Sequence, residues 1–305
     1  MLVKKNKKTY ILYILLVAIA VIYGSCKPKP RDLHKVTFKP VWGIKYTEVK
    51  KKHTNGRSFN KYGYQLEPSW QITFLSDDSA RLYATNTKSF ANFHITNDHD
   101  SIFHVARSWF RAEKLTKDSL VFQVMMVESN VIYFLKSSVF VTFYADDYIK
   151  NVLKTTPAKL QRPDRADTLF VRYMITHPDK NPDSLFAARN PVVFKSKNPN
   201  IKVNKTEVVA DESNRYNTTD AYMRPEYNIV VNKAYKNFDY SFTVVVDERG
   251  NIRFGKSLIG SYVDNTDVIR AIIDGYLKPY LDVTPGSTLG MPQASKVYIN
   301  LKGRK

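Results

Sequence analysis

The sequence has little cysteine, glycine or acidic charge. One cysteine in 305 residues, Cys26, excludes an intramolecular disulfide and a cysteine-based zinc site. The 11 glycines show no repeated spacing, which argues against a collagen-like array or a glycine-rich phosphate loop. The 28 acidic residues against 47 Lys and Arg leave a formal net charge of +19. With 43% apolar and 25% charged residues, the chain is not disordered over long stretches, and its length predicts about two domains.

The first 26 residues follow the pattern of an export signal. A lysine-rich start without acids precedes 14 uncharged, mostly apolar residues, Tyr10 to Tyr23, and then the small residues Gly24 and Ser25. As a helix the apolar run spans about 21 Å, short of the roughly 30 Å hydrocarbon core of a bilayer. A cleaved signal is therefore favoured over a stable transmembrane helix.

The segment Gly24-Ser25-Cys26 resembles the lipobox of bacterial lipoproteins, whose cysteine is acylated and begins the mature chain. The resemblance implies a signal peptide over residues 1–25 and a lipidated Cys26. It also implies a membrane-anchored lipoprotein of the bacterial cell envelope that faces the periplasm or the cell surface. The alternative is a buried cysteine behind an uncleaved anchor. Since a stray thiol is a liability in an oxidising compartment, the single cysteine at this position favours lipidation.

A basic segment follows the cysteine. Residues 26–35 contain Lys27-Pro28-Lys29-Pro30-Arg31, whose prolines predict an extended tether. Residues 27–61 hold eleven Lys and Arg against two acids, a net of +9. Each basic residue near an anionic leaflet contributes about 1 kcal/mol to membrane binding. This segment therefore either binds the membrane surface or is a solvated part of the chain. An exported chain without a nucleic-acid motif is not expected to bind nucleic acid.

Residues 36–150 predict an all-β domain. Turn signals such as Asn55-Gly56 and Asn97-Asp98 separate short runs rich in β-branched and aromatic residues. Eight such runs predict an antiparallel meander closed into a small barrel or half-barrel. The runs cover residues 41–44, 70–74, 81–83, 90–95, 102–105, 120–124, 131–134 and 139–144.

This domain resembles the lipocalin-like domains of bacterial envelope lipoproteins. The resemblance rests on Trp70-Gln71-Ile72-Thr73-Phe74 and on the segment Lys114 to Phe122, KLTKDSLVF. It implies a barrel whose interior holds a small apolar ligand. The alternative is an interior filled by the domain's own aromatic side chains.

Residues 151–218 contain six prolines and many Asp, Asn and Lys, which predicts an irregular connection. Within it we expect a strand over residues 169–173 and a short helical turn over residues 183–189.

Residues 219–305 predict a small β-β-α-β module. A strand over residues 240–246 meets a turn with Gly250 at its tight position, and the return strand begins at Ile252. A helix is expected from the N-cap candidates at 264–266 to Pro279, followed by a final strand over residues 296–301. Its apolar face is predicted to consist of Val268, Ile269, Ile272, Ile273, Tyr276 and Leu277. The predicted fold class of the whole chain is α+β, mainly β.

This module resembles the C-terminal domain of TonB-type energy transducers. The residues that carry the resemblance are Phe242 to Ile252, Ala271-Ile272-Ile273, Lys278-Pro279 and Gly290-Met291-Pro292. It implies that the module binds another envelope protein by adding a strand at an exposed sheet edge. The partner-binding edge is expected in the last strand, at Val297, Tyr298, Ile299 and Leu301. The alternative is a module with capped edges and no partner.

Nothing in the sequence predicts an enzyme, a metal site or a cofactor. The densest polar cluster, His94 to His104 with Asp98, His99 and Asp100, lacks the spacing of a zinc enzyme and reads as a hairpin tip. Arg107-Ser108-Trp109, Tyr62 and Tyr64 are expected to line a wall rather than to perform chemistry. The predicted function is a non-catalytic envelope lipoprotein that serves as a protein-interaction or scaffold module. The alternative function is a lipocalin-like carrier of a small hydrophobic ligand.

Acylation of Cys26 is directly testable. Metabolic labelling with a fatty-acid analogue in a bacterial host should label the wild-type chain and leave Cys26→Ala unlabelled, because the thiol is the acyl acceptor. An unlabelled wild-type chain, or a mature protein recovered with a free thiol, would contradict the anchor.

Overall fold

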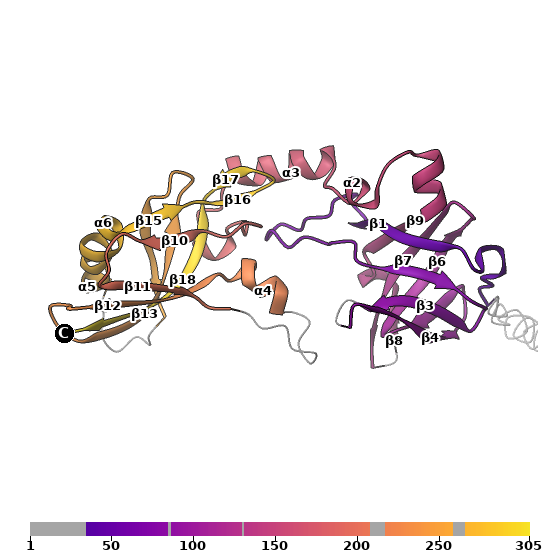
Figure 1. Ribbon diagram of the computed structural model, residues 1–305, viewed down its shortest axis with the longest axis horizontal. Coiled ribbons are helices and arrows are strands. Elements are labelled where there is room, and N and C mark those ends of the chain that lie inside the picture. Colours follow the sequence, from indigo (N-terminus) through magenta and orange to yellow (C-terminus); the bar gives the residue numbers. More distant parts are fainter. Residues whose placement is uncertain (1–34, 85–86, 130, 208–216, 259–265) are drawn as a thin grey trace, which may run out of the picture.

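The computed structural model describes residues 35–84, 87–129, 131–207, 217–258 and 266–305. They form two lobes set end to end, an N-terminal β-barrel and a C-terminal lobe built on a mixed sheet (Figure 1). The predicted signal, Cys26 and nearly all of the tether lie outside the described residues, as do Asp264 and Asn265 at the expected helix start. None of the helices in the described ranges has the length and apolarity needed to cross a bilayer.

The N-terminal lobe is a closed antiparallel barrel of eight strands. The sheet order is β6-β5-β4-β3-β2-β1-β9-β7, and pairing of β6 with β7 closes it, so the prediction of a barrel is confirmed. The strands are β1 (Lys45–His53), β2 (Gln71–Phe74), β3 (Ser79–Ala84), β4 (Ser89–Asn97), β5 (Ile102–Val105), β6 (Ser108–Leu115), β7 (Ser119–Glu128) and β9 (Val139–Ala145).

Aromatic rings pack together in the centre of the barrel. Phe38 stacks on Phe74 with ring centroids 4.0 Å apart, and Phe122 lies 5.2 Å from Phe103 and 5.6 Å from Phe143. All five rings are at most 1% exposed. An eight-stranded barrel is just wide enough for side chains to fill, and here phenylalanines do so.

Two of the expected barrel strands need correction. Residues 41–44 are not a strand, because Pro40 occupies the first turn of the 3-10 helix η1 (Lys39–Val41), and β1 begins only at Lys45. The run at 131–134 forms β8 (Val131–Tyr133), which pairs with β7 outside the closed ring, and the 3-10 helix η2 (Phe134–Lys136). The two barrel strands that were not predicted are β1 and β6.

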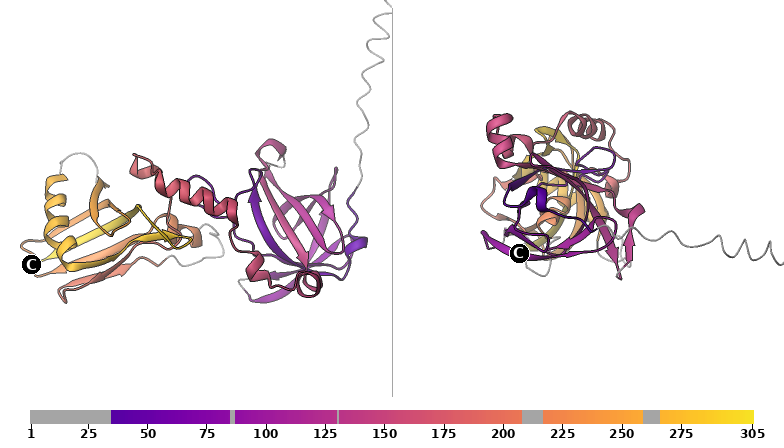
Figure 2. Two further views of the ribbon diagram at one scale, coloured as in Figure 1. Left: turned by 90° about the horizontal axis from the view of Figure 1, so that it is seen from above. Right: turned by 90° about the vertical axis from the view of Figure 1, so that its right-hand side faces the viewer.

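The connection between the lobes contains a helix where a strand was predicted. Residues 169–173 belong to α3 (Arg165–Thr176), which spans from the barrel towards the C-terminal lobe (Figure 2). Asp164 caps the helix and forms a reciprocal capping box with Asp167. The apolar residues fit helical rather than alternating spacing, since Phe170, Val171, Met174 and Ile175 share the buried side.

Short elements flank α3. The helical turn expected over 183–189 is only the 3-10 helix η4 (Pro182–Ser184). The π-helix η3 (Tyr148–Val152) and α2 (Pro157–Leu160) precede α3.

The C-terminal lobe is built on a five-stranded sheet of order β11-β12-β18-β13-β14. The predicted hairpin of β13 and β14 and the last strand are confirmed, and Gly250 takes a φ of +87° in the turn. β11 comes from the stretch predicted to be an irregular connection. The strands are β11 (Ile201–Lys205), β12 (Glu226–Asn232), β13 (Phe238–Val246), β14 (Ile252–Ser257) and β18 (Ser295–Arg304). Two small sheets accompany them, β10 (Val193–Ser196) with β15 (Leu281–Thr284) and β16 (Gly286–Thr288) with β17 (Met291–Gln293).

The predicted helix packs its apolar face against this sheet. It runs as α5 (Thr266–Ile272), the π-helix η5 (Ile273–Leu277) and α6 (Lys278–Tyr280), and Ile269, Ile272, Ile273 and Leu277 are buried in the lobe's core. Pro279 does not end the helix. It lies in the first turn of α6, where its missing N–H is tolerated, and the helix ends at Tyr280.

A buried glutamate stands where the chain re-enters the barrel. Glu48 of β1 is fully buried, and its Oε2 accepts hydrogen bonds from the backbone N–H groups of Ser69 (2.7 Å) and Trp70 (2.9 Å). Its Oε1 has no hydrogen-bond partner among the residues that the structure describes. Burial raises the pKa of the Glu48 carboxyl, against the smaller opposing influence of Lys51 and the two backbone N–H groups.

This raised pKa predicts a pH dependence of stability. The folded state binds the proton more tightly than the unfolded chain, so Glu48 lowers the free energy of unfolding as pH rises from the unfolded value near 4.5 through the folded pKa. Glu48→Gln keeps an oxygen acceptor for both N–H groups and removes the titration. Urea unfolding at pH 5 and pH 7.5 should therefore show a smaller loss of stability with rising pH in this variant than in the wild type. An identical pH dependence in the two proteins would contradict the assignment, and the exposed Glu113→Gln serves as the control.

Candidate functional site

A long connection of the barrel reaches out to the C-terminal lobe. We call residues 54–70, between β1 and β2, the β1–β2 arm. An antiparallel bridge between Phe59 and Gln65 gives it the form of a hairpin. The Asn60 side chain holds its tip, accepting hydrogen bonds from the N–H groups of Tyr62 (2.9 Å) and Tyr64 (3.0 Å). The hydrogen bonds of Asn60 therefore order the tip from within the arm.

The arm docks through a small apolar cluster and a buried carboxylate. Phe59 is 1% exposed and packs with Val171 of α3 and Phe186. Burying such a ring contributes roughly 2–3 kcal/mol. Next to it, the N–H of Ser58 donates to Asp167 Oδ1 at 2.6 Å, so the capping-box partner of Asp164 in the first turn of α3 also holds the arm.

Close backbone contact fixes the tip of the arm. The N–H of Ala187 donates to the carbonyl of Tyr62 at 3.0 Å, and Gly63 has a φ of +91°. A Cβ at Gly63 would lie 2.6 Å from the backbone N and O of Ala187. Only glycine combines this conformation with this approach.

Arg189 joins the same surfaces by charge and stacking. Its Nε donates to Gln65 Oε1 at 3.0 Å, its Nη2 pairs with Glu67, and its guanidinium lies 4.2 Å from the centroid of the Tyr222 ring. The Tyr222 hydroxyl accepts a hydrogen bond from the N–H of Gln65 at 3.1 Å. Burial raises the pKa of Tyr222, which keeps the phenol protonated.

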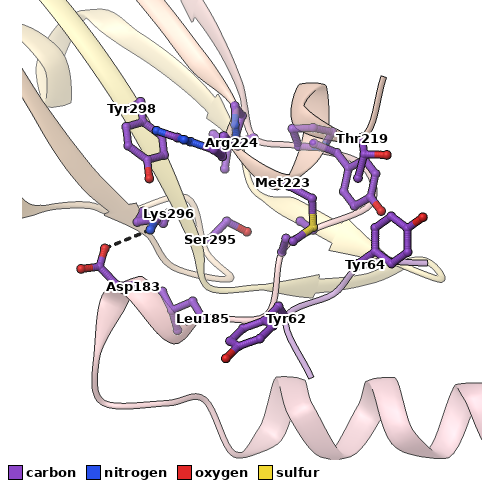
Figure 3. A pocket seen from close by; sticks show the side chains of 16 residues that line it. Tyr62, Tyr64, Asp183, Leu185, Thr219, Met223, Arg224, Ser295, Lys296 and Tyr298 are labelled. Atoms are coloured by element: carbon purple, nitrogen blue, oxygen red, sulfur yellow. Dashed lines mark hydrogen bonds and ion pairs between the residues drawn. The ribbon is translucent and has the colours of Figure 1, made fainter. Parts of the chain in front are cut away.

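A pocket of about 620 Å³ lies where these segments meet (Figure 3). The walls come from the arm, from η4 and the loop after it, from α4 (Asn217–Met223) and the two residues that follow it, and from the first half of β18. The lining residues are Tyr62, Tyr64, Asp183, Leu185, Ala187, Ala188, Pro191, Val192, Thr219, Tyr222, Met223, Arg224, Pro225, Ser295, Lys296 and Tyr298.

The charges at the pocket are arranged on one side. Asp183 pairs with Lys296 at 3.0 Å and Lys256 at 2.5 Å, and the hydrogen bonds from these two lysines lower its pKa. The same contact with Asp183 raises the pKa of Lys256. The guanidinium of Arg224 lies 5.0 Å from the centroid of the Tyr298 ring. The wall is thus net positive and aromatic.

The side chains that line the pocket can bind a ligand by aromatic stacking, hydrogen bonds and charge. Asp183 already serves as acceptor for two ammonium groups, so it is not placed as a free general base. Across the described ranges no group of three or more His, Cys, Asp or Glu residues is placed to hold a metal ion. In the β4–β5 hairpin of the barrel, the His99 ring contacts Asp98 (3.0 Å) and Asp100 (3.7 Å).

No protein-family model, curated protein or solved structure matches this chain.

The predicted partner-binding edge is wrong, because the last strand is the central strand of its sheet. β18 pairs in parallel with β12 on one side and antiparallel with β13 on the other, so its main-chain groups are used on both sides. Val297, Ile299 and Leu301 are buried in the core, and only Tyr298 reaches the pocket. Lipidation at Cys26 lies outside the described residues.

Of the residues expected from the sequence to line a wall, Tyr62 and Tyr64 line this pocket, whereas Ser108 lines a separate small cavity beside Trp70 and Phe110. It missed Asp183, Arg224 and Lys296 as site residues. Arg224-Pro225 directly before a strand was the only available signal, since the other two become neighbours only through the fold.

The backbone approach at Gly63 predicts a large effect of a single methyl group. Gly63→Ala should destabilise the protein by at least about 3 kcal/mol, because strain at positive φ adds to the clash with Ala187. Gly56→Ala in the same arm also has positive φ but meets nothing within 4 Å, so its expected cost is about 1 kcal/mol. Chemical denaturation of both variants measures the difference, and equal destabilisation would show that the contact with Ala187 does not matter.

Proposed function

We propose that this protein is a non-catalytic lipoprotein of the bacterial cell envelope that binds a partner protein by strand addition to its C-terminal sheet. The export-signal pattern and the lipobox-like Gly24-Ser25-Cys26 support the membrane anchor. The resemblance of residues 219–305 to the TonB C-terminal domain supports partner binding. The observation that carries the proposal is a regular strand at the edge of the sheet, whose outer side pairs with no other strand of the described residues.

That strand is β11. Its five residues pair with β12 without a register shift. The N–H of Asn232 donates to the carbonyl of Asn200, and the N–H of Thr206 donates to the carbonyl of Glu226. Antiparallel alternation then directs the main-chain groups of residues 202 and 204 towards β12, and those of Val203 and Lys205 outwards. Within the part of the chain described here, no strand pairs with that outer side.

The charge of this edge indicates an acidic partner. Lys202 and Lys205 are exposed on β11, and in the described residues neither forms an ion pair. Lysines on an edge strand discourage self-association while they attract a segment of opposite charge.

The opposite edge strand, β14, is less suitable for strand addition. Its register against β13 shifts between Phe242 and Val244, and Lys256 is bound to Asp183. We therefore assign partner binding to β11.

A carrier function based on the barrel receives less support. The lipocalin-like resemblance implies an internal ligand site, but phenylalanine rings occupy the described centre of the barrel. A cavity beside Trp70 and Phe110 measures only about 50 Å³, too small for a hydrophobic cargo.

Proline at an outward-facing position tests the strand addition. Val203→Pro removes an N–H that points away from β12, so the sheet is kept but one main-chain donor to the partner is lost. Val203→Ala keeps this donor and is the matched control. In affinity purification from the native envelope, stoichiometric partner capture should be lost with Val203→Pro and retained with Val203→Ala.

Circular dichroism and thermal unfolding should show that both variants are folded. A folded Val203→Pro variant that captures the same partner as the wild type would refute strand addition at β11.

A further inference from the structure

Arg224 is a cation without a counterion at a pocket whose other charges are matched. Lys296 is paired with Asp183, and Arg189 beside the pocket is paired with Glu67. Arg224 forms no ion pair or hydrogen bond with any described residue and contacts only the Tyr298 ring. Its planar group of five donors matches the two oxygens of a carboxylate.

Three residues of the pocket lining carry hydroxyl groups that have no hydrogen-bond partner among the described residues. Among the described residues, the phenols of Tyr62 and Tyr298 and the hydroxyl of Thr219 form no hydrogen bonds. Figure 3 shows these three side chains on different sides of the pocket. Each hydroxyl both donates and accepts, which suits a ligand that carries several hydroxyls itself. Tyrosine rings also offer apolar faces to the C–H faces of a flat, polar ring.

The pocket volume, about 620 Å³, falls in the range that takes small organic ligands, and it accommodates a short chain of sugar rings. We propose that this pocket binds a short saccharide that carries a carboxylate. Arg224 binds the carboxylate, Tyr62 and Tyr298 contact ring faces, and the side-chain hydroxyls bind sugar hydroxyls. An aromatic carboxylate or a phosphate would use the cation but leave the dispersed hydroxyls unpaired. This proposal is independent of partner binding at β11.

Isothermal titration calorimetry of the full chain in detergent tests the proposal. The acidic probes are α-1,4-digalacturonate, D-glucuronate and N-acetylmuramic acid. α-1,4-Digalactose is the uncharged counterpart, and benzoate and inorganic phosphate supply the anion without a sugar. We expect binding of at least one acidic saccharide, at least about tenfold tighter than digalactose, benzoate or phosphate.

Substitutions then assign the contacts. Arg224→Met should weaken binding of the acidic saccharide by about tenfold or more while leaving digalactose binding unchanged. Arg270→Met is the matched control, since Arg270 also lies over an aromatic ring, Phe254, but does not line the pocket. Tyr62→Ala, at an exposed side chain, should weaken the charged and uncharged sugars alike.

Three results would overturn the proposal. The first is that none of the acidic saccharides binds. The second is that benzoate or phosphate binds as tightly as the best saccharide. The third is that folded Arg224→Met retains wild-type affinity. If Arg224→Met does not fold, unchanged saccharide affinity in Tyr62→Ala overturns it.

Discussion

The arrangement of the two lobes depends on one backbone contact, that of Gly63 against Ala187. It places the tip of the β1–β2 arm so close to the C-terminal lobe that the carbonyl of Tyr62 accepts the N–H of Ala187. At this backbone distance there is no room for a side chain at position 63 between the two segments. Everything else at the junction, including the burial of Phe59 and the stacking of Arg189 on Tyr222, requires the arm to be in that place.

At this junction the barrel lobe and the C-terminal lobe together form the pocket. The pocket has walls from both lobes, so neither lobe forms it alone. Asp167 connects the same junction to α3, because its side chain accepts both the N–H of the N-cap residue Asp164 and the N–H of Ser58. The Asp167 carboxylate is 1% exposed and lies 3.9 Å from the ammonium group of Lys52 in β1. Its partners thus come from α3, the arm and the barrel, and these contacts hold the three segments together.

Local patterns predicted the strands well where composition and turns agreed, and failed where a distant partner decided the structure. The runs around Phe74, Phe122 and Phe143 lie between clear turn signals and are strands of the barrel. Residues 169–173 have strand-forming composition, yet they are helical because the Asp164–Asp167 capping box nucleates α3 and Phe59 covers its apolar side. Strand β6 was missed because Arg111, Glu113 and Lys114 reduce its hydrophobicity, and pairing on both sides compensates for this.

The sequence alone determines features that depend on neighbours along the chain. These are the export-signal pattern, the positive charge, the mainly β composition, the β13–β14 turn at Gly250 and the apolar face of the last helix. The order of strands does not follow, because hydrogen bonding between strands depends on which segments meet in space. The final strand, read as an edge, is central because β12 inserts beside it in parallel. The pocket, too, exists only in the tertiary structure, which brings Tyr62, Asp183, Arg224 and Tyr298 together from four separate parts of the sequence.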